Sequence, residues 1–247
     1  MTKVNHYEIL ADLQKQYPRD KSNDYLMRAD ALALIEHGKL HYVQTPDGLF
    51  LFAEREGFYK CIFRLRDWSA IIPEATKPMG IYLTYRAECP PLDATQWLLS
   101  NGFSHHVTLQ RYTARALANG PLSDDVKAAG AEETYAMLSA YFSAEEMDLP
   151  TRDLFRRAYC VRADDGSLQG VLNDMGHTRI YAVSPDARGR GIGGRLYRAF
   201  AADKSCGQAT APILHEWVRP DNPASISMLK KLGFEQDTRM TSCYVKR

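Results

Sequence analysis

The stretch VSPDARGRGIGGRLYRAF (residues 183–200) places four glycines among four arginines and then continues as an amphipathic pattern. Glycine allows positive φ angles and lets a ligand approach the backbone N–H groups closely. Unpaired N–H groups at the start of a helix, together with the helix dipole, form a binding site for phosphate. After the glycines, apolar residues recur at helical spacing, namely Ile192, Leu196, Ala199 and Phe200. The stretch therefore predicts a loop that holds a pyrophosphate and leads into a helix packed on a sheet.

Two known phosphate loops fit this stretch poorly. A Walker loop ends in Gly-Lys-Ser/Thr, whereas this loop ends in Gly-Gly-Arg at residues 193–195. The spacing of residues 189–194 fits the dinucleotide fingerprint GxGxxG, but the first glycine comes six residues after Val183, beyond a proline. Only 53 residues follow the last glycine, too few for the rest of a doubly wound sheet. We therefore expect neither nucleotide triphosphate hydrolysis nor a Rossmann fold.

The segment RGRGIG (188–193) resembles the R/Q-x-x-G-x-G/A loop of the GCN5-related N-acetyltransferases, the GNAT family. Downstream, Asn222, Ser225 and LKKLGFE (229–235) resemble the asparagine, small residue, helix and Gly-Phe strand that close the family's fold. The resemblance is specific over residues 179–243. It implies a mixed sheet that is splayed at its middle, with the pantetheine arm of acetyl-CoA lying in the splay like an additional strand.

The same resemblance implies which residues bind acetyl-CoA. Backbone groups of Tyr181 and Val183 would meet the pantetheine arm, and Asn222 would touch it near the second strand of the splay. The pyrophosphate would be held by loop amides, which belong to Gly189, Arg190, Gly191, Ile192, Gly193 and Gly194. Arg188 and Arg190 would contact the phosphates from the side, unless they are solvated loop charges.

Acetyl transfer in this family is implied to be a direct attack of a neutral amine on the thioester. The reaction needs a base, an oxyanion donor such as the backbone amide near Val183, and a proton for the leaving thiolate. The tyrosine that the family often places four residues before the glycine of Gly-Phe is replaced here by Leu229. Tyr244 on the last strand is our candidate acid, although a thiolate can also leave without one. Glu216 is our candidate base; His215, which faces the other side of its strand, and a water relay or a base on the substrate stay open.

An internal repeat links the two halves of the chain. Residues 83–103 align without a gap on residues 214–234, at a constant offset of 131. Each copy predicts a strand, a loop, a helix, a glycine at the helix end and a final strand. In the first half, WSAIIPEATKPMG (68–80) is too short and too interrupted by prolines for a phosphate loop and a full helix. We therefore expect a degenerate first half that has lost cofactor binding and shapes a substrate cleft or an interface.

The best candidate for a domain boundary is the small, polar segment near Asn119, which is interrupted by Gly120 and Pro121. It predicts a degenerate GNAT-like N-terminal domain over 1–118 and an acetyl-CoA-binding GNAT domain over 119–247. The fold class is α/β (α+β), and each domain has a mixed, mostly antiparallel sheet flanked by helices.

Local patterns predict the elements of both halves. Helical spacing runs over 23–38, with Asn23 as its cap and Gly38 as its stop, and over 132–142. Strand-like runs joined by turn residues lie at 40–44, 49–55, 58–65, 159–163, 168–175 and 178–183.

Composition excludes several classes of protein. Lys and Arg total 31 against 30 Asp and Glu, so no broad positive surface for nucleic acid is expected. No run approaches the roughly 20 apolar residues of a membrane span, and the N-terminus lacks a signal-peptide core. We expect a cytoplasmic protein without a membrane partner. No metal is expected, because His105 and His106 are adjacent on a strand and face opposite sides.

The sequence thus predicts an N-acetyltransferase that moves an acetyl group from its co-substrate acetyl-CoA to a primary amine of a small molecule or peptide. Whether it forms a homodimer stays open. Two other functions stay open as well. Leu229 suggests a non-catalytic, regulatory acyl-CoA-binding protein, and the tandem architecture suggests an aminoacyl-tRNA-dependent transferase, which would not need an intact pyrophosphate loop.

Overall fold

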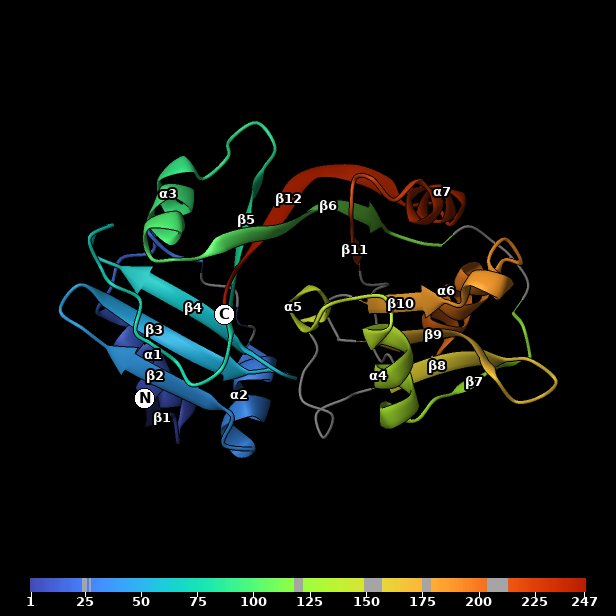
Figure 1. Ribbon diagram of the computed structural model, residues 1–247, viewed down its shortest axis with the longest axis horizontal. Coiled ribbons are helices and arrows are strands. Elements are labelled where there is room, and N and C mark those ends of the chain that lie inside the picture. The colour runs from blue at the N-terminus through green and yellow to red at the C-terminus, as the bar shows by residue number, and fades with distance from the viewer. Residues whose placement is uncertain (24–25, 27, 118–121, 149–156, 175–178, 204–212) are drawn as a thin grey trace. The chain divides into compact units, whose positions relative to one another are not determined.

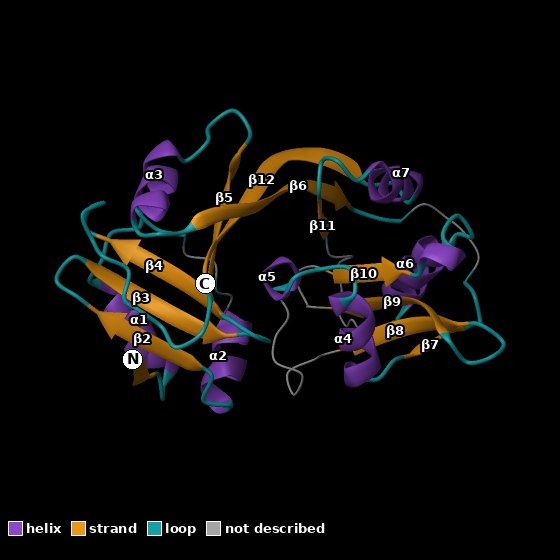
Figure 2. Ribbon diagram, in the orientation of Figure 1, coloured by secondary structure: helices purple, strands orange, loops and turns teal. Residues whose placement is uncertain are grey.

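The computed structural model describes residues 1–23, 26, 28–117, 122–148, 157–174, 179–203 and 213–247. Figure 1 labels its elements along the chain, and Figure 2 colours them by type. The helices are α1 (Tyr7–Lys15), α2 (Arg28–Glu36), α3 (Leu92–Ser100), α4 (Ala131–Ser139), α5 (Ala144–Met147), α6 (Ile192–Ala202) and α7 (Pro223–Lys231), with a 3-10 turn, η2, at Pro185–Ala187. The strands are β1 (Thr2–Lys3), β2 (Leu40–Gln44), β3 (Gly48–Glu54), β4 (Tyr59–Leu65), β5 (Met79–Arg86), β6 (Ser104–Ala114), β7 (Val126–Ala128), β8 (Arg157–Arg162), β9 (Leu168–Asp174), β10 (Arg179–Val183), β11 (Leu214–Val218) and β12 (Glu235–Lys246).

The chain folds into two compact units, which we call unit 1 and unit 2. Unit 1 consists of Met1–Thr108 together with Met240–Arg247, and unit 2 consists of Leu109–Arg239. The boundary that we expected between residues 118 and 119 lies outside the described residues. The domain limits 1–118 and 119–247 therefore stay a prediction.

Unit 1 is built on a mixed, mostly antiparallel sheet. Its strands follow the order β1-β2-β3-β4-β5, continued by the end of β12 and the start of β6. β4 and β5 are parallel and pair through Tyr59 opposite Met79 and Lys60 opposite Gly80. All seven residues of β4 are buried, as expected for a strand covered on both faces. α3 packs on this sheet through Trp97 and Leu98, which belong to the same core as the aromatic residues of β3 and β4.

In unit 2 the strands form two separate pieces. β10, β9, β8 and β7 make an antiparallel sheet in that order, and β11 pairs with β6 from Leu214 opposite Ala114 to Val218 opposite Gln110. β10 and β11 each lie at the end of their own sheet. Leu172 packs in a cluster with residues of α6, whereas its neighbour Val171 packs with residues of α4, so the two helices cover opposite faces of β9. The predicted fold class, helices flanking a mixed and mostly antiparallel sheet, is confirmed.

The long strands β6 and β12 contribute to both units. Residues Ser104–Thr108 of β6 belong to unit 1 and the rest to unit 2, while β12 begins in unit 2 and passes into unit 1 after Arg239. In unit 1 the β12 end is held by the Tyr85 and Ser242 hydroxyls at 2.9 Å. In unit 2 the side chain of Gln110 donates to the carbonyl of Arg239 at 3.0 Å. Each unit is therefore completed by a strand from the other half of the sequence.

The element bounds follow the sequence offset. α3 and α7 start at 92 and 223 and end at 100 and 231, and the two crossing points at 108 and 239 are also 131 apart. β3 and β9, in contrast, start at 48 and 168, and β4 and β10 start at 59 and 179, an offset of 120. Unit 2 thus has 11 more residues between these strands and the helix, in the interval that holds the glycine loop and α6. A duplication predicts this pattern, and the duplication itself stays a prediction.

One local expectation was wrong. Asn23 does not cap a helix: its side chain accepts a hydrogen bond from the Phe63 amide at 2.6 Å and donates one to the Cys61 carbonyl at 3.1 Å. α2 starts at Arg28. A polar side chain that satisfies strand groups cannot be distinguished from a cap by local sequence. Gly38, at φ 67°, does follow the end of α2 as expected.

None of the helices within the described part of the chain combines the length and the apolar character that a membrane span needs.

Deleting Met240–Arg247 should destabilise unit 1 and leave unit 2 folded. The deletion removes buried residues of β12, among them Tyr244, and exposes the edge of β5. Hydrogen exchange followed by mass spectrometry should show lost protection in β4 and β5 but retained protection in β8 and β9. A chain lacking only the exposed Arg247 is the control. Equal loss of protection in β9 would show that unit 2 depends on these residues as well.

Candidate functional site

A pocket with a volume of about 660 Å³ lies in unit 2, at the end of β10. Three segments dominate its wall: the turn after α4, the glycine loop with the start of α6, and α7. The lining residues are Tyr141, Phe142, Tyr181, Ala182, Val183, Ala187, Arg188, Gly189, Gly191, Ile192, Gly193, Gly194, Arg198, Arg219, Asn222, Ala224, Ser225, Ser227, Met228, Lys231 and Leu232. A volume of this size suits a small-molecule ligand.

The glycine loop has the backbone conformation that its composition predicts. Gly189 and Gly191 have φ angles of 77° and 74°, which side-chain-bearing residues rarely adopt. Gly191 is the N-cap of α6, an 11-residue helix, and its carbonyl accepts the first helical bond, from the Arg195 amide at 3.1 Å. Ile192 and Leu196 are buried against β9, which fixes the helix on the sheet. The loop therefore directs unpaired amides of a helix N-terminus toward the pocket.

The edge of β10 that faces away from β9 pairs with no other strand in the described part of the chain. The Ser184 amide donates to the Gln169 carbonyl of β9 at 2.9 Å. Because successive residues of a strand direct their backbone groups to alternate sides, the N–H and C=O groups of Tyr181 and Val183 point away from β9. Both residues line the pocket. An extended ligand at this edge would meet the backbone groups that the family resemblance assigned to the pantetheine arm.

The arginines of the loop differ in their surroundings. Nε of Arg188 donates to the Val183 carbonyl at 3.3 Å, and its guanidinium lies 5.7 Å from the centroid of the Tyr141 ring. Arg190 is exposed and does not line the pocket. Arg188 thus closes the loop onto its own strand, and the phosphate contacts expected of both arginines stay predictions.

Asn222 lies in the pocket wall and also has a structural role. Its Oδ1 accepts a hydrogen bond from the Ser225 amide at 3.1 Å and caps α7. Capping occupies the oxygen and leaves the amide group as a donor, so the expected contact with a ligand is compatible with the cap.

A buried ion pair joins the two separated strands. Nε of Arg179 on β10 lies 2.6 Å from Oε1 of Glu216 on β11. Nη2 of Arg179 donates to the His215 carbonyl at 3.0 Å. The two side chains are only 4% and 2% exposed. Burial raises the pKa of Glu216, and the guanidinium of Arg179 opposes that rise. Arg179 therefore links β10 and β11 at a place where the strands are not paired through their backbones.

This environment bears on the role expected of Glu216. Glu216 is bound to Arg179 and is not among the residues that line the pocket, and its role as a base stays a prediction. His215, the next residue, is half-buried. Burial, followed by the positive charges of Arg111 and Arg179, lowers the pKa of His215. Its imidazole is therefore neutral near pH 7.

Tyr244 lies in unit 1, not in unit 2. Its hydroxyl is 3.1 Å from the Thr95 hydroxyl, its ring packs edge-on to His105 at 5.5 Å, and only 6% of the residue is exposed. These contacts make it a packed core tyrosine, and its role as an acid stays a prediction. Leu229, at the family's tyrosine position, is fully buried in the core of unit 2.

Sequence reasoning missed much of the pocket wall. Tyr141 and Phe142 were assigned to a helix face, but α4 ends at Ser139 and both residues follow it. Three cations were also missed: besides Arg188, the lining includes Arg198, Arg219 and Lys231, but no acidic residue. Arg219 and Lys231 come 21 and 33 residues after Arg198, so no local pattern connects the three. Only the packing of α6 against α7 brings them to one pocket. The resulting positive wall favours a ligand with several negative charges.

Comparisons with known proteins agree with this geometry. Residues 131–234 match the model of the acetyltransferase (GNAT) family. The chain therefore has the fold of the GNAT acetyltransferases.

Three solved structures illustrate the likeness. An acetyltransferase of the GNAT family from Colwellia psychrerythraea has a TM-score of 0.51 and 15% identity, with 99% of each chain covered. A GCN5-related N-acetyltransferase from Kribbella flavida has a TM-score of 0.51 and 14% identity, covering 88% of this chain and 93% of that one. A tandem GNAT protein from the clavulanic acid biosynthesis pathway has a TM-score of 0.53 and 13% identity, covering 97% and 92%. At these identities the likeness shows the fold. No curated protein matches the chain significantly.

Replacing Arg179 by methionine should reduce the free energy of unfolding by about 3 kcal/mol, because it leaves the Glu216 carboxylate buried without its partner. Without the guanidinium, the folded-state pKa of Glu216 lies further above its unfolded value. The stability of the variant is then retained at low pH and lost as the pH rises, so the deficit should be larger at about pH 8 than at about pH 5. Urea denaturation of the variant and of the native chain at both pH values measures the difference in their free energies of unfolding.

The double variant Arg179→Met, Glu216→Leu is the matched control. It removes both charges, so its loss should be smaller than that of the single variant and independent of pH. Equal stability of the single variant and the native chain would show that the pair does not hold β10 and β11 together.

Proposed function

We propose that the chain is an N-acetyltransferase in which unit 2 binds acetyl-CoA and transfers its acetyl group to a primary amine of a small molecule or peptide. One observation carries the proposal: the open edge of β10 leads directly to the glycine loop at the start of α6. An extended arm and a pyrophosphate therefore find their binding groups in the order in which acetyl-CoA presents them.

The residues of the pocket fit acetyl-CoA. Backbone groups of Tyr181 and Val183 would hold the pantetheine arm, with the Asn222 amide beside it. The pyrophosphate would be bound by the amides of residues 189–194, and the positive wall would favour its charge. When bound, acetyl-CoA supplies the thioester that the amine attacks.

The backbone amide of Val183 is the donor that would stabilise the oxyanion, because it lies on the open edge and needs no side chain. We assign the base to His215 in preference to Glu216, acting through a water relay because His215 is not among the residues that line the pocket. Its lowered pKa leaves a proton acceptor near neutral pH, whereas the Glu216 carboxylate is bound to Arg179. We assign no acid: Leu229 has no proton to give, and a thiolate can leave unprotonated.

Unit 1 is proposed to be a degenerate copy of the same fold. α3 and α7 begin and end at positions that differ by the repeat offset of 131, which supports this proposal. Unit 1 is also 11 residues shorter in the interval that holds the glycine loop and α6 in unit 2. Without a loop of amides it would not hold a pyrophosphate. Acetyl-CoA binding and the reaction would then belong to unit 2.

Calorimetric titration with acetyl-CoA, with ATP and NAD as controls, tests the binding step. Selective binding of acetyl-CoA supports the proposal, and no binding contradicts it. A panel of primary amines with detection of free CoA thiol then tests transfer. Binding without turnover on any amine would favour the alternative of a non-catalytic acyl-CoA-binding protein, for which Leu229 speaks.

Gly191→Ala should weaken acetyl-CoA binding about fivefold, because backbone strain disfavours the left-handed turn that directs the loop amides at the ligand. Gly166→Ala is the matched control. Gly166 has a φ of 85°, and a Cβ at either glycine would meet no atom within 4 Å. Both substitutions therefore cost about 1 kcal/mol of backbone strain, but Gly166 lies in the turn between β8 and β9, outside the pocket. Equal affinity of the two variants would refute the role of the loop.

His215→Gln should lower kcat about 100-fold while leaving acetyl-CoA affinity unchanged. In the native chain the rate should be constant near pH 7 and fall only below about pH 6.5, because the imidazole becomes protonated there. The variant should lose this acidic limb. A variant that retains the limb would show that another group accepts the proton, and Glu216→Gln is the comparison that identifies it.

A further inference from the structure

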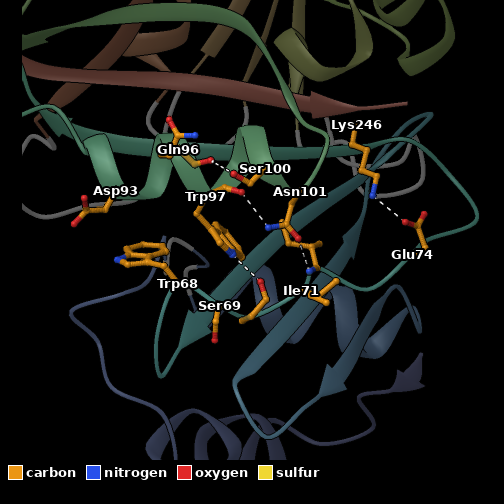
Figure 3. Close-up of a pocket in the computed structure, with 12 residues that line it drawn as sticks. Trp68, Ser69, Ile71, Glu74, Asp93, Gln96, Trp97, Ser100, Asn101 and Lys246 are labelled. Carbon is orange, nitrogen blue, oxygen red and sulfur yellow. Dashed lines mark hydrogen bonds and ion pairs between the residues drawn. The ribbon is translucent and has the colours of Figure 1, made fainter.

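A second pocket, of about 630 Å³, lies in unit 1 between α3 and the segment that follows β4. Figure 3 shows its lining side chains, with Trp68 and Asp93 on one side and Glu74 and Lys246 on the other. The remaining lining residues are Ser69, Ala70, Ile71, Ile72, Gln96, Trp97, Ser100 and Asn101. The size suits a small organic ligand.

This pocket uses the same helix face as the pocket of unit 2. The residues of α3 and its end that line it are 93, 96, 97, 100 and 101. At the repeat offset of 131 these become 224, 227, 228, 231 and 232, and all five line the pocket of unit 2. The two halves thus have a pocket at the equivalent place, but with different side chains.

The inner part of the unit 1 site is filled by the chain itself. Nε1 of Trp97 donates to the Ala70 carbonyl at 2.7 Å, and Oδ1 of Asn101 accepts from the Ile72 amide at 2.9 Å. Ala70 and Ile72 are buried in the core of the unit. The segment therefore forms a fixed wall, and only its outer side is open to a ligand.

The wall offers apolar and aromatic surface. Ile71 is 79% exposed, although it is a large aliphatic residue beside a cavity. Trp68 is half-buried, and its ring packs 5.6 Å from that of Trp97, which holds it in place. The face of a tryptophan ring is the strongest aromatic partner for a cation.

The charges of the pocket are opposite to those in unit 2. Its ionisable lining residues are Glu74, Asp93 and Lys246, and Lys246 is bound to Glu74 at 2.9 Å. The pocket therefore carries one carboxylate in excess, and Asp93 is exposed in the first turn of α3. A phosphate-bearing ligand such as CoA would find neither a positive wall nor a glycine loop here, since residues 66–78 contain no glycine.

We propose that this pocket is a second ligand site, specific for an organic cation with an apolar body, of the alkylammonium class. The ammonium group lies between the Asp93 carboxylate and the Trp68 ring, which Figure 3 shows on the same side of the pocket, and the apolar body extends from there along the wall toward Ile71. The site does not depend on acetyl transfer in unit 2.

Titration with n-butylammonium, followed by saturation-transfer NMR, tests the proposal. 1-Butanol and butyrate are the matched probes, because they keep the apolar body and replace the positive charge by a neutral or negative group. We expect saturable binding of butylammonium, and at least about tenfold weaker binding of both other probes. No saturable binding of butylammonium, or equal binding of butanol, overturns the proposal.

Two variants locate the site. Asp93→Asn should raise the Kd for butylammonium about tenfold, whereas Glu88→Gln, which removes an exposed carboxylate outside the pocket, should not. Trp68→Leu keeps an apolar side chain and removes the ring, and it should weaken binding similarly. Unchanged melting temperatures show that the variants are folded. An unchanged Kd in Asp93→Asn overturns the assignment.

Gly191→Ala separates this inference from acetyl transfer. It should bind acetyl-CoA more weakly and bind butylammonium like the native chain, so failure of either idea leaves the other testable. Loss of butylammonium binding in Gly191→Ala would place the cation site in unit 2 and refute the assignment to unit 1.

Discussion

The gap between β10 and β11 is the constraint on which unit 2 depends. The two strands are linked by the side chains of Arg179 and Glu216. Each is the last strand of its own sheet, and the two do not pair through their backbones. A continuous ladder would satisfy the edge of β10 and leave nothing for a ligand to bind. The Arg179 side chain holds the strands at one end, through Glu216 and the His215 carbonyl, and leaves the backbone groups of Tyr181 and the Val183 amide available to a ligand. The pocket, the direction of the loop and the fit to an extended ligand all follow from this separation.

The same element order produces two different pockets. In unit 2, the interval after β10 has room for a turn, a loop with two left-handed glycines and an 11-residue helix. In unit 1, the shorter interval folds back against α3, and Trp97 and Asn101 satisfy its backbone groups. One half offers backbone donors to an anion, whereas the other uses its donors internally and presents a carboxylate and an indole ring. The pocket beside the glycine loop and the pocket without such a loop therefore carry opposite charge.

Strands β6 and β12 make the two halves of the sequence mutually dependent. Each unit takes the first part of its own final strand and the last part of the other one. Neither sheet is complete with residues of one half alone, although each half has its own helices and most of its own strands.

Local chemistry was readable in the sequence. Glycines that take positive φ, the apolar stripe of α6 and the repeat around α3 and α7 all act within a few turns of the chain, so their patterns predicted the loop, the helix and the equal helix bounds. Tertiary structure alone decided the rest. The partner of Glu216 is Arg179, which is 37 residues away. The part of β12 after Arg239 completes unit 1. In unit 1, Ala70 and Ile72 occupy the inner part of the pocket beside α3. Such pairings depend on which distant groups meet in the folded chain, because a buried charge or backbone group takes whichever partner the packing brings within reach.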